Sequence, residues 1–113
     1  MKTEKQRPVK EVTVHELKTL IDNQVDFQLI DVREAYEHKV ANIGGKLIPL
    51  GQLYFHLGEI DRDRKVIVYC RSGRRSAEAI RLITEVKGLE NLFNLKDGLI
   101  EWSIEIDSTI FVD

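Results

Sequence analysis

The sequence lacks the features that would place a protein in a membrane, outside the cell or on nucleic acid. Its longest apolar run extends only from Val66 to Cys70, whereas a membrane-spanning helix needs about 20 apolar residues. The 17 Lys and Arg nearly balance the 19 Asp and Glu, and the net charge of -2 gives no general attraction to nucleic acid or an anionic membrane. Residues Met1–Pro8 are charged and lack the apolar stretch of a signal peptide. We therefore expect a cytoplasmic protein that binds neither nucleic acid nor membranes.

The sequence also lacks the patterns of disulfide, metal and nucleotide sites. Cys70 is the single cysteine, so no internal disulfide can form, which fits the reducing cytoplasm. There is neither a P-loop nor the glycine fingerprint of dinucleotide sites. The histidines His15, His38 and His56 lie on separate segments, so we expect surface histidines rather than a metal site. No cofactor is expected, and the lone thiol needs an explanation of its own.

The length and composition suit one compact domain. A chain of 113 residues with 42% hydrophobic residues can bury one core but not two. Residues 1–8 are polar, lack periodicity and end in a proline. We expect them to form a flexible tail or linker, followed by a single domain over residues 9–113.

Periodicity predicts helices and strands in alternation. Thr13 and Glu16 have the spacing of a capping box, and the apolar stripe behind them predicts a helix over 14–23. Phe27–Val32 and Lys65–Tyr69 are short apolar runs, typical of buried strands in a parallel sheet. Between these strands we expect a helical turn over 33–39, turn and short strand over 43–51, and one helical turn over 53–60.

The second half of the chain continues the alternation. A helix is expected from Ser76, capped by Gly88. Its inward face should carry Ala77, Ile80, Ile83 and Val86. Asn91–Leu95 reads as a strand and Leu99–Ile106 as a last helix. The order predicts an α/β fold with a mainly parallel sheet covered on both faces.

Polar residues lie at or after the carboxyl ends of two of the expected strands, at the sheet edge where ligands bind in such folds. Asp31 is the last polar residue of the strand Phe27–Val32, near its carboxyl end, and Cys70 follows the strand Lys65–Tyr69. The segment from Cys70 to the helix at Ser76 contains three arginines and Gly73, which allows the chain to curl. Backbone N–H groups, a helix N-terminus and arginine charge together favour a thiolate. A cysteine alone is more often a small buried apolar residue, but this setting favours a reactive one.

The stretch Cys70–Ser76 (CRSGRRS) resembles the active-site loop of rhodanese-like sulfurtransferases. Three further segments match the same family in the same order along the chain. They are Leu29–Glu34 (LIDVRE), Asn42–Gly45 (NIGG) with Ile48–Leu50 (IPL), and Asn94–Gly98 (NLKDG) leading to Trp102. Together the matching segments cover nearly the whole chain from Val9 to Ile106.

This resemblance implies a three-layer α/β/α fold and a sulfurtransferase without cofactor. Cys70 would take a sulfane sulfur as a persulfide from a small anionic donor such as thiosulfate, or from a protein persulfide, and pass it to a thiophilic acceptor. Asp31 and Arg33 would form a supporting acid–arginine pair near the base of the loop. The backbone amides that bind the substrate would be those of Arg71, Ser72, Gly73, Arg74, Arg75 and Ser76.

The chain departs from the family pattern at two places. Asn42–Gly45 replaces a frequent His-Ile-Pro-Gly, and Asp97-Gly98 replaces a frequent Gly-Gly. The first departure also occurs in rhodanese-like domains fused to sulfur-carrier-activating adenylyltransferases. That similarity raises a sulfur-carrier protein or a fused adenylyltransferase as partners.

Two alternatives come from other functional classes. Cysteine phosphatases and arsenate reductases of this fold have an arginine where this chain has Ser76, to hold phosphate oxygens bidentately. Arg75 lies one residue earlier, so the loop is too short for a phosphate. The other alternative is an interaction or regulatory domain, although such domains usually lose the cysteine. Tyr36 and Phe55 are candidates to line the mouth of the site, with packing the favoured alternative for both.

Overall fold

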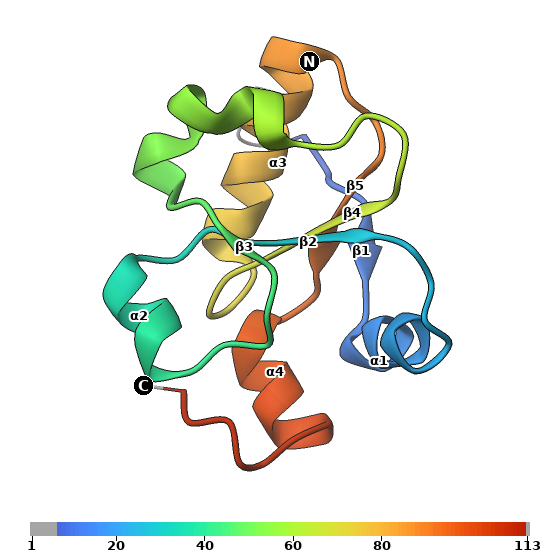
Figure 1. Ribbon diagram of the computed structural model, residues 1–113, viewed down its shortest axis with the longest axis vertical. Helices are drawn as coiled ribbons and strands as arrows, with labels where there is room; N and C mark the ends of the chain where they lie inside the picture. Colours follow the sequence, from blue (N-terminus) through green and yellow to red (C-terminus); the bar gives the residue numbers. More distant parts are fainter. Residues whose placement is uncertain (1–6, 113) are drawn as a thin grey trace.

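The computed structural model describes residues 7–112, so most of the expected tail lies outside the described part of the chain. A parallel five-stranded sheet forms its centre (Figure 1). Its strands, in spatial order, are β1 (Glu11–Val12), β5 (Leu92–Leu95), β4 (Val66–Tyr69), β2 (Gln28–Asp31) and β3 (Lys46–Leu47). The expected parallel sheet is confirmed.

Helical segments connect successive strands, and the last one follows β5. They are α1 (Val14–Asp22), α2 (Ala35–Val40), the 3-10 helix η2 (Leu50–Glu59), α3 (Arg74–Lys87) and α4 (Gly98–Glu105). The segment after β2 forms a short helix rather than a single turn, and η2 is longer than expected. Within residues 7–112, no helix has the length and apolar character needed to cross a membrane.

Side chains alternate across β4 and divide the core into two layers. Val66 and Val68 pack into the hydrophobic cluster shared with α3 and η2. Ile67 and Tyr69 pack into the other cluster, which is shared with α1 and α4. Figure 1 shows α3 and η2 above the strands and α1 and α4 below them. The fold is therefore the expected α/β/α arrangement.

Local sequence signals explain where α1 begins and α3 ends. The Glu16 N–H donates to Thr13 Oγ1 at 3.0 Å, and the Thr13 N–H donates to Glu16 Oε1 at 2.8 Å, which completes the capping box. Gly88 caps the C-terminus of α3 with a φ of 67°, a left-handed conformation that favours glycine. Both signals are confirmed.

The inward face of α3 differs from the expectation. Its buried residues are Ser76, Ala79, Ile80 and Ile83. Val86 is 45% exposed, and Ala77 is only half-buried. The helix begins at Arg74, and Ser76 faces the cysteine, so the buried positions follow the spacing that starts at Ser76.

Candidate functional site

Cys70 lies at the carboxyl end of β4, and its sulfur faces the inside of the following loop. The N–H of Gly73 donates to Cys70 Sγ at 3.1 Å, and the N–H of Ser76 donates to the same atom at 3.4 Å. The Ser76 hydroxyl oxygen lies 3.3 Å from the sulfur. Cys70 is 1% exposed. The sulfur is therefore shielded from bulk water, and the two N–H donors stabilise negative charge on it.

The Asn94 side chain of β5 holds this loop through two hydrogen bonds. Its Oδ1 accepts from the Ser76 hydroxyl at 2.5 Å, and its Nδ2 donates to the Gly73 carbonyl at 2.9 Å. Ser76 and Asn94 are both buried. Asn94 thus holds the two residues whose N–H groups meet the sulfur.

Backbone N–H groups at the start of α4 donate hydrogen bonds to two carbonyl groups of the loop. The Leu99 N–H donates to the Cys70 carbonyl at 2.9 Å, and the Ile100 N–H donates to the Arg71 carbonyl at 3.0 Å. Gly98 has a φ of 64°, and a Cβ there would lie 2.5 Å from the Arg71 carbonyl oxygen. Only glycine permits this close approach. With these carbonyls turned toward α4, the loop presents N–H groups to the sulfur.

Asp31 and Arg33 form a buried ion pair at the end of β2. The Arg33 Nε donates to Asp31 Oδ1 at 3.0 Å, and Nη2 donates to Oδ2 at 2.8 Å. Nη2 also donates to the Ala41 carbonyl at 2.7 Å. Burial acts to lower the pKa of Arg33, but the hydrogen bonds and charge of Asp31 outweigh it and raise the pKa. The guanidinium is therefore permanently charged.

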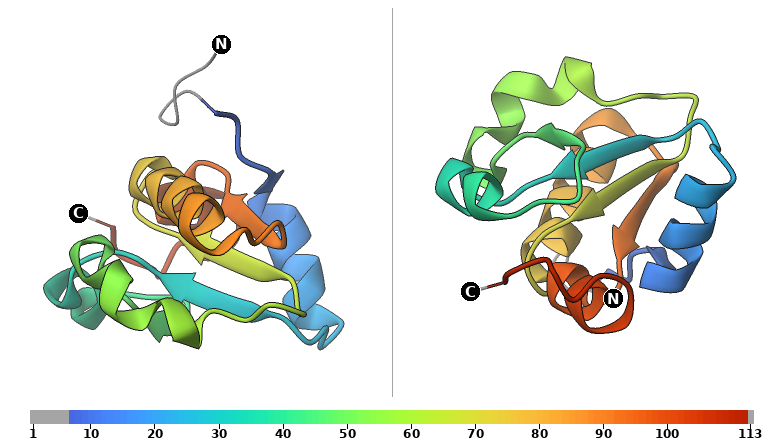
Figure 2. Two further views of the ribbon diagram at one scale, coloured as in Figure 1. Left: turned by 90° about the horizontal axis from the view of Figure 1, so that it is seen from above. Right: turned by 60° about the horizontal axis from the view of Figure 1, so that its bottom comes forward.

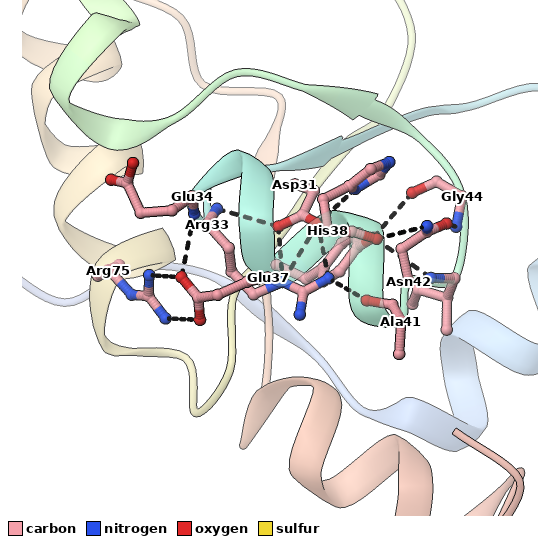
Figure 3. Close-up of polar contacts among 11 residues, drawn as sticks. Asp31, Arg33, Glu34, Glu37, His38, Ala41, Asn42, Gly44 and Arg75 are labelled. Atoms are coloured by element: carbon pink, nitrogen blue, oxygen red, sulfur yellow. Dashed lines mark hydrogen bonds and ion pairs between the residues drawn. The ribbon is translucent and has the colours of Figure 1, made fainter. Parts of the chain in front are cut away.

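His38 of α2 is a third member of this cluster, which the sequence reasoning placed on the surface. Its Nδ1 lies 2.8 Å from Asp31 Oδ2, and its side chain is 24% exposed (Figure 3). The assignment as a surface histidine was wrong because α2 forms a helix that turns His38 toward Asp31. Asn42, at the frequent histidine position of the family pattern, instead bonds the His38 carbonyl and the Gly44 N–H.

Tyr69 links the Asp31–Arg33 pair to the cysteine that follows it in the chain. The Arg33 guanidinium lies over the Tyr69 ring, 5.6 Å from its centroid. The Tyr69 hydroxyl donates to the Gly44 carbonyl at 2.8 Å. Burial raises the pKa of Tyr69, so its hydroxyl stays protonated and keeps this bond.

Arg75, in the first turn of α3, reaches across to α2. Its Nη1 donates to Glu37 Oε1 at 2.6 Å and its Nη2 to Oε2 at 2.9 Å, as Figure 3 shows. The hydrogen bonds from Arg75 lower the pKa of Glu37 to about 2, although burial opposes the shift. The Arg75 guanidinium therefore holds α2 against α3.

The predicted site residues occupy different places around the sulfur. Gly73 and Ser76 contact it directly. Arg75 faces Glu37. Exposed residues of the loop are Arg71, Ser72 and Arg74. The substrate-binding role assigned to these residues stays a prediction, as does the supporting role of Asp31 and Arg33.

Sequence reasoning did not single out Glu37 and Asn94 as parts of the site. Asn94 lay within a segment quoted for the family resemblance, and Glu37 lay in the charged stretch after β2. The expected packing of Tyr36 and Phe55 was wrong, since they are 70% and 86% exposed. Within residues 7–112, no cluster of three or more His, Cys, Asp and Glu could hold a metal ion.

The sequence of this chain is similar to those of known proteins. Residues 13–105 match the rhodanese-like domain family. The chain is 31% identical over 96 residues to a sulfurtransferase of Allochromatium vinosum, covering 84% of this chain and 89% of that protein. It is 32% identical over 104 residues to the adenylyltransferase and sulfurtransferase MOCS3-2 of Zea mays, covering 85% of this chain but 21% of that protein.

Other relatives are longer than this chain, which spans 51% and 24% of two further curated proteins. Among solved structures, reduced CoADR-RHD of Bacillus anthracis superposes with a TM-score of 0.78 at 31% identity. The match covers 92% of this chain and 18% of that one. On the family match over residues 13–105, the chain belongs to the rhodanese-like domain family.

Proposed function

We propose that this domain is a sulfurtransferase in which Cys70 carries the transferred sulfur as a persulfide. One observation carries the proposal: the buried Cys70 sulfur accepts hydrogen bonds from the N–H groups of Gly73 and Ser76. These donors stabilise a thiolate before the reaction and the terminal sulfur of a persulfide after it. The sulfurtransferase name of the Allochromatium relative supports the same role.

The reaction divides into two displacements. In the first, the Cys70 thiolate attacks the outer sulfur of thiosulfate, a new S–S bond forms on Cys70, and the old S–S bond breaks with its electron pair leaving as sulfite. In the second, an acceptor such as cyanide attacks the terminal persulfide sulfur. Thiocyanate departs and the Cys70 thiolate returns, so both atoms and charge balance. The steps need no cofactor.

The position of Arg75 speaks against the phosphatase alternative. A phosphatase loop needs a guanidinium aimed at the phosphate oxygens. Here both Nη atoms of Arg75 bond Glu37 instead. The exposed Arg71 and Arg74 lie within the loop, where their charge would attract an anionic sulfur donor.

A paired assay distinguishes the two chemistries. The domain is given thiosulfate with cyanide in one vessel and p-nitrophenyl phosphate in another, and Cys70→Ser serves as the control in both. We expect thiocyanate that depends on Cys70 and negligible phosphate release. Phosphate release that depends on Cys70 and outpaces thiocyanate formation would favour the phosphatase instead.

The physiological partner belongs to the same proposal. The name of the Zea mays relative joins an adenylyltransferase to a sulfurtransferase, which supports a fused adenylyltransferase as the partner here. A Bacillus subtilis relative is named a putative sulfur carrier protein, which supports a sulfur-carrier protein as the other candidate. A protein persulfide would then serve as donor in place of thiosulfate. A reduced Cys70 also fits the cytoplasm. Incubation of the persulfide form with a sulfur-carrier protein, followed by mass spectrometry of the carrier, tests this transfer.

A further inference from the structure

A groove lies between α3 and η2, which pack side by side on one face of the sheet (Figure 1, Figure 2). Its volume is about 400 Å³. The apolar part of its lining comes from Leu50, Tyr54 and Leu82, and Tyr54 is 64% exposed. An apolar groove beside an exposed aromatic ring is typical of a surface that binds another protein.

The α3 side of this groove carries a regular line of charges. Four charged residues follow one another at intervals of four, three and four positions, so they share one face of the helix. They are Arg74, Glu78, Arg81 and Glu85, and the last three line the groove. In the part of the chain that the structure describes, Arg74, Glu78 and Glu85 make no ion pair or side-chain hydrogen bond. Arg81 donates only its Nε, to the Arg7 carbonyl at 2.7 Å. The face therefore offers positive, negative, positive and negative charge in that order.

This order of charges is complementary to itself when it is reversed. A second α3 can lie antiparallel to the first, with a twofold axis that passes midway between Glu78 and Arg81. Arg74 of each copy then faces Glu85 of the other, and Glu78 of each copy faces Arg81 of the other. A symmetric contact forms each pair twice, so opposite charges meet at all four positions of both helices.

The same charges disfavour the neighbouring registers of an antiparallel contact. When one helix slides by four residues in one direction, Arg74 faces Arg81. When it slides by four residues in the other direction, Glu78 faces Glu85. Like charges that face each other oppose association. The line of charges therefore selects one register of two antiparallel copies.

The grooves of the two copies adjoin each other in this arrangement. The twofold axis is perpendicular to both helices, so the η2 side of each copy lies on the same side of the contact. Tyr54 of each copy can then pack across the axis, against the groove that Leu82 lines in the other. Burial of these apolar groups supplies the main driving force, since exposed ion pairs contribute little affinity and mainly fix the register.

We propose that this chain forms a symmetric dimer through antiparallel contact of its α3 helices, in which a second copy covers the groove between α3 and η2. The inference goes beyond the proposed function, because the contact needs no chemistry at Cys70. Arg74 belongs both to the contact and to the Cys70 loop, so the dimer should weaken the attraction of this arginine for an anionic donor.

Charge reversal tests the register. Sedimentation equilibrium of the full chain measures the dissociation constant of the dimer, with a reductant present to prevent disulfides between copies. Glu78→Arg and Arg81→Glu each place like charges opposite each other twice, and each should weaken the dimer about tenfold or more. An equimolar mixture of the two variants should form a heterodimer about as tight as the wild-type dimer, because opposite charges face each other again. Glu90→Arg is the matched control, since Glu90 is exposed and lies outside the groove.

A second pair of variants tests the groove. Tyr54→Ala should weaken the dimer about five- to tenfold through the loss of buried apolar area. Phe55→Ala should leave the dissociation constant unchanged, because Phe55 is 86% exposed and lies outside the groove. Thermal melting of every variant verifies the fold.

Three results would overturn the proposal and leave the proposed function intact. The first is a wild type that stays monomeric up to millimolar concentration, which would leave the groove to a different protein. The second is a dimer whose dissociation constant is the same in the wild type, Glu78→Arg and Arg81→Glu. The third is a mixture of these two variants that stays monomeric, which would contradict the antiparallel register.

Discussion

Glu37 and Arg75 join α2 to the first turn of α3 through two parallel hydrogen bonds of 2.6 and 2.9 Å. The Glu37 side chain is 17% exposed and that of Arg75 is 33% exposed, so water screens the pair less than an ion pair on the open surface. α3 also supplies Ser76, whose N–H meets the Cys70 sulfur. The pair therefore fixes the helix on which the loop ends.

Replacement of Glu37 should destabilise the domain in a pH-dependent way. Glu37→Gln removes the charge, and we expect the free energy of unfolding at pH 7 to fall by about 1–2 kcal/mol. The folded-state pKa of Glu37 is lowered from 4.5 to about 2. The stabilisation is thus fully present above about pH 4.5 and is lost as the pH falls toward 2. Urea denaturation at pH 7, 4 and 3 measures the difference between wild type and variant.

The control for this prediction is Glu85→Gln, which changes an exposed glutamate of α3. It should alter stability little at any of these pH values. A Glu37→Gln deficit that stays the same at pH 3 as at pH 7 would contradict the role given to the ion pair.

Gly98→Ala should damage the loop more than a matched glycine substitution elsewhere. Gly98 and Gly88 have similar φ values of 64° and 67°, so both substitutions cost about 1–2 kcal/mol of backbone strain. A Cβ added at Gly98 would meet the Arg71 carbonyl, whereas a Cβ added at Gly88 would meet no atom of a non-neighbouring residue within 4 Å. We expect a further loss of about 1–3 kcal/mol at Gly98.

The same substitution should affect catalysis, because the Cys70 and Arg71 carbonyls must move away from α4. We expect Gly98→Ala to lower kcat for sulfur transfer by about 10- to 100-fold, and Gly88→Ala to leave kcat near the wild-type value. Equal losses of stability and kcat in the two variants would contradict the claim that close packing of Gly98 against the loop positions the loop.

Ser76 and Asn94 should behave as a coupled pair. Each single alanine variant leaves a buried polar partner without its hydrogen bond and should cost about 1–3 kcal/mol. The double variant should cost less than the sum by about 1 kcal/mol. Unfolding free energies for Ser76→Ala, Asn94→Ala and the double variant measure this coupling. A second cycle pairs Ser76→Ala with Asn91→Ala, since Asn91 bonds the carbonyls of Asp61 and Arg64 instead. Additive values in the first cycle would contradict the pairing.

The elements that were predicted correctly from the sequence are those that form through interactions between residues close together in the chain. The β-branched run before Cys70 forms β4, because such side chains favour strands. Thr13 and Glu16 begin α1 through hydrogen bonds within one turn. The segment 50–59 is different, because a 3-10 helix lacks the 3.6-residue periodicity from which an α-helix is read.

The parts of the site that were not predicted depend on tertiary contacts. Glu37 lies 38 residues from Arg75 in the chain, and Asn94 lies 18 residues from Ser76. No local pattern pairs residues so far apart. Likewise, His38 meets Asp31 only because α2 forms a helix after β2. The sequence could predict a loop curled around Cys70, but not the side chains that hold this loop in place.

The most direct test of the central claim is mass spectrometry of the intact protein after incubation with thiosulfate. Cys70 is the single cysteine, so the wild type should gain the mass of one sulfur atom, and a reductant or cyanide should remove it. Peptide mapping should place the added sulfur on Cys70. Cys70→Ser should gain nothing and form no thiocyanate. A serine variant that transfers sulfur to cyanide at a rate comparable to the wild type would contradict the account.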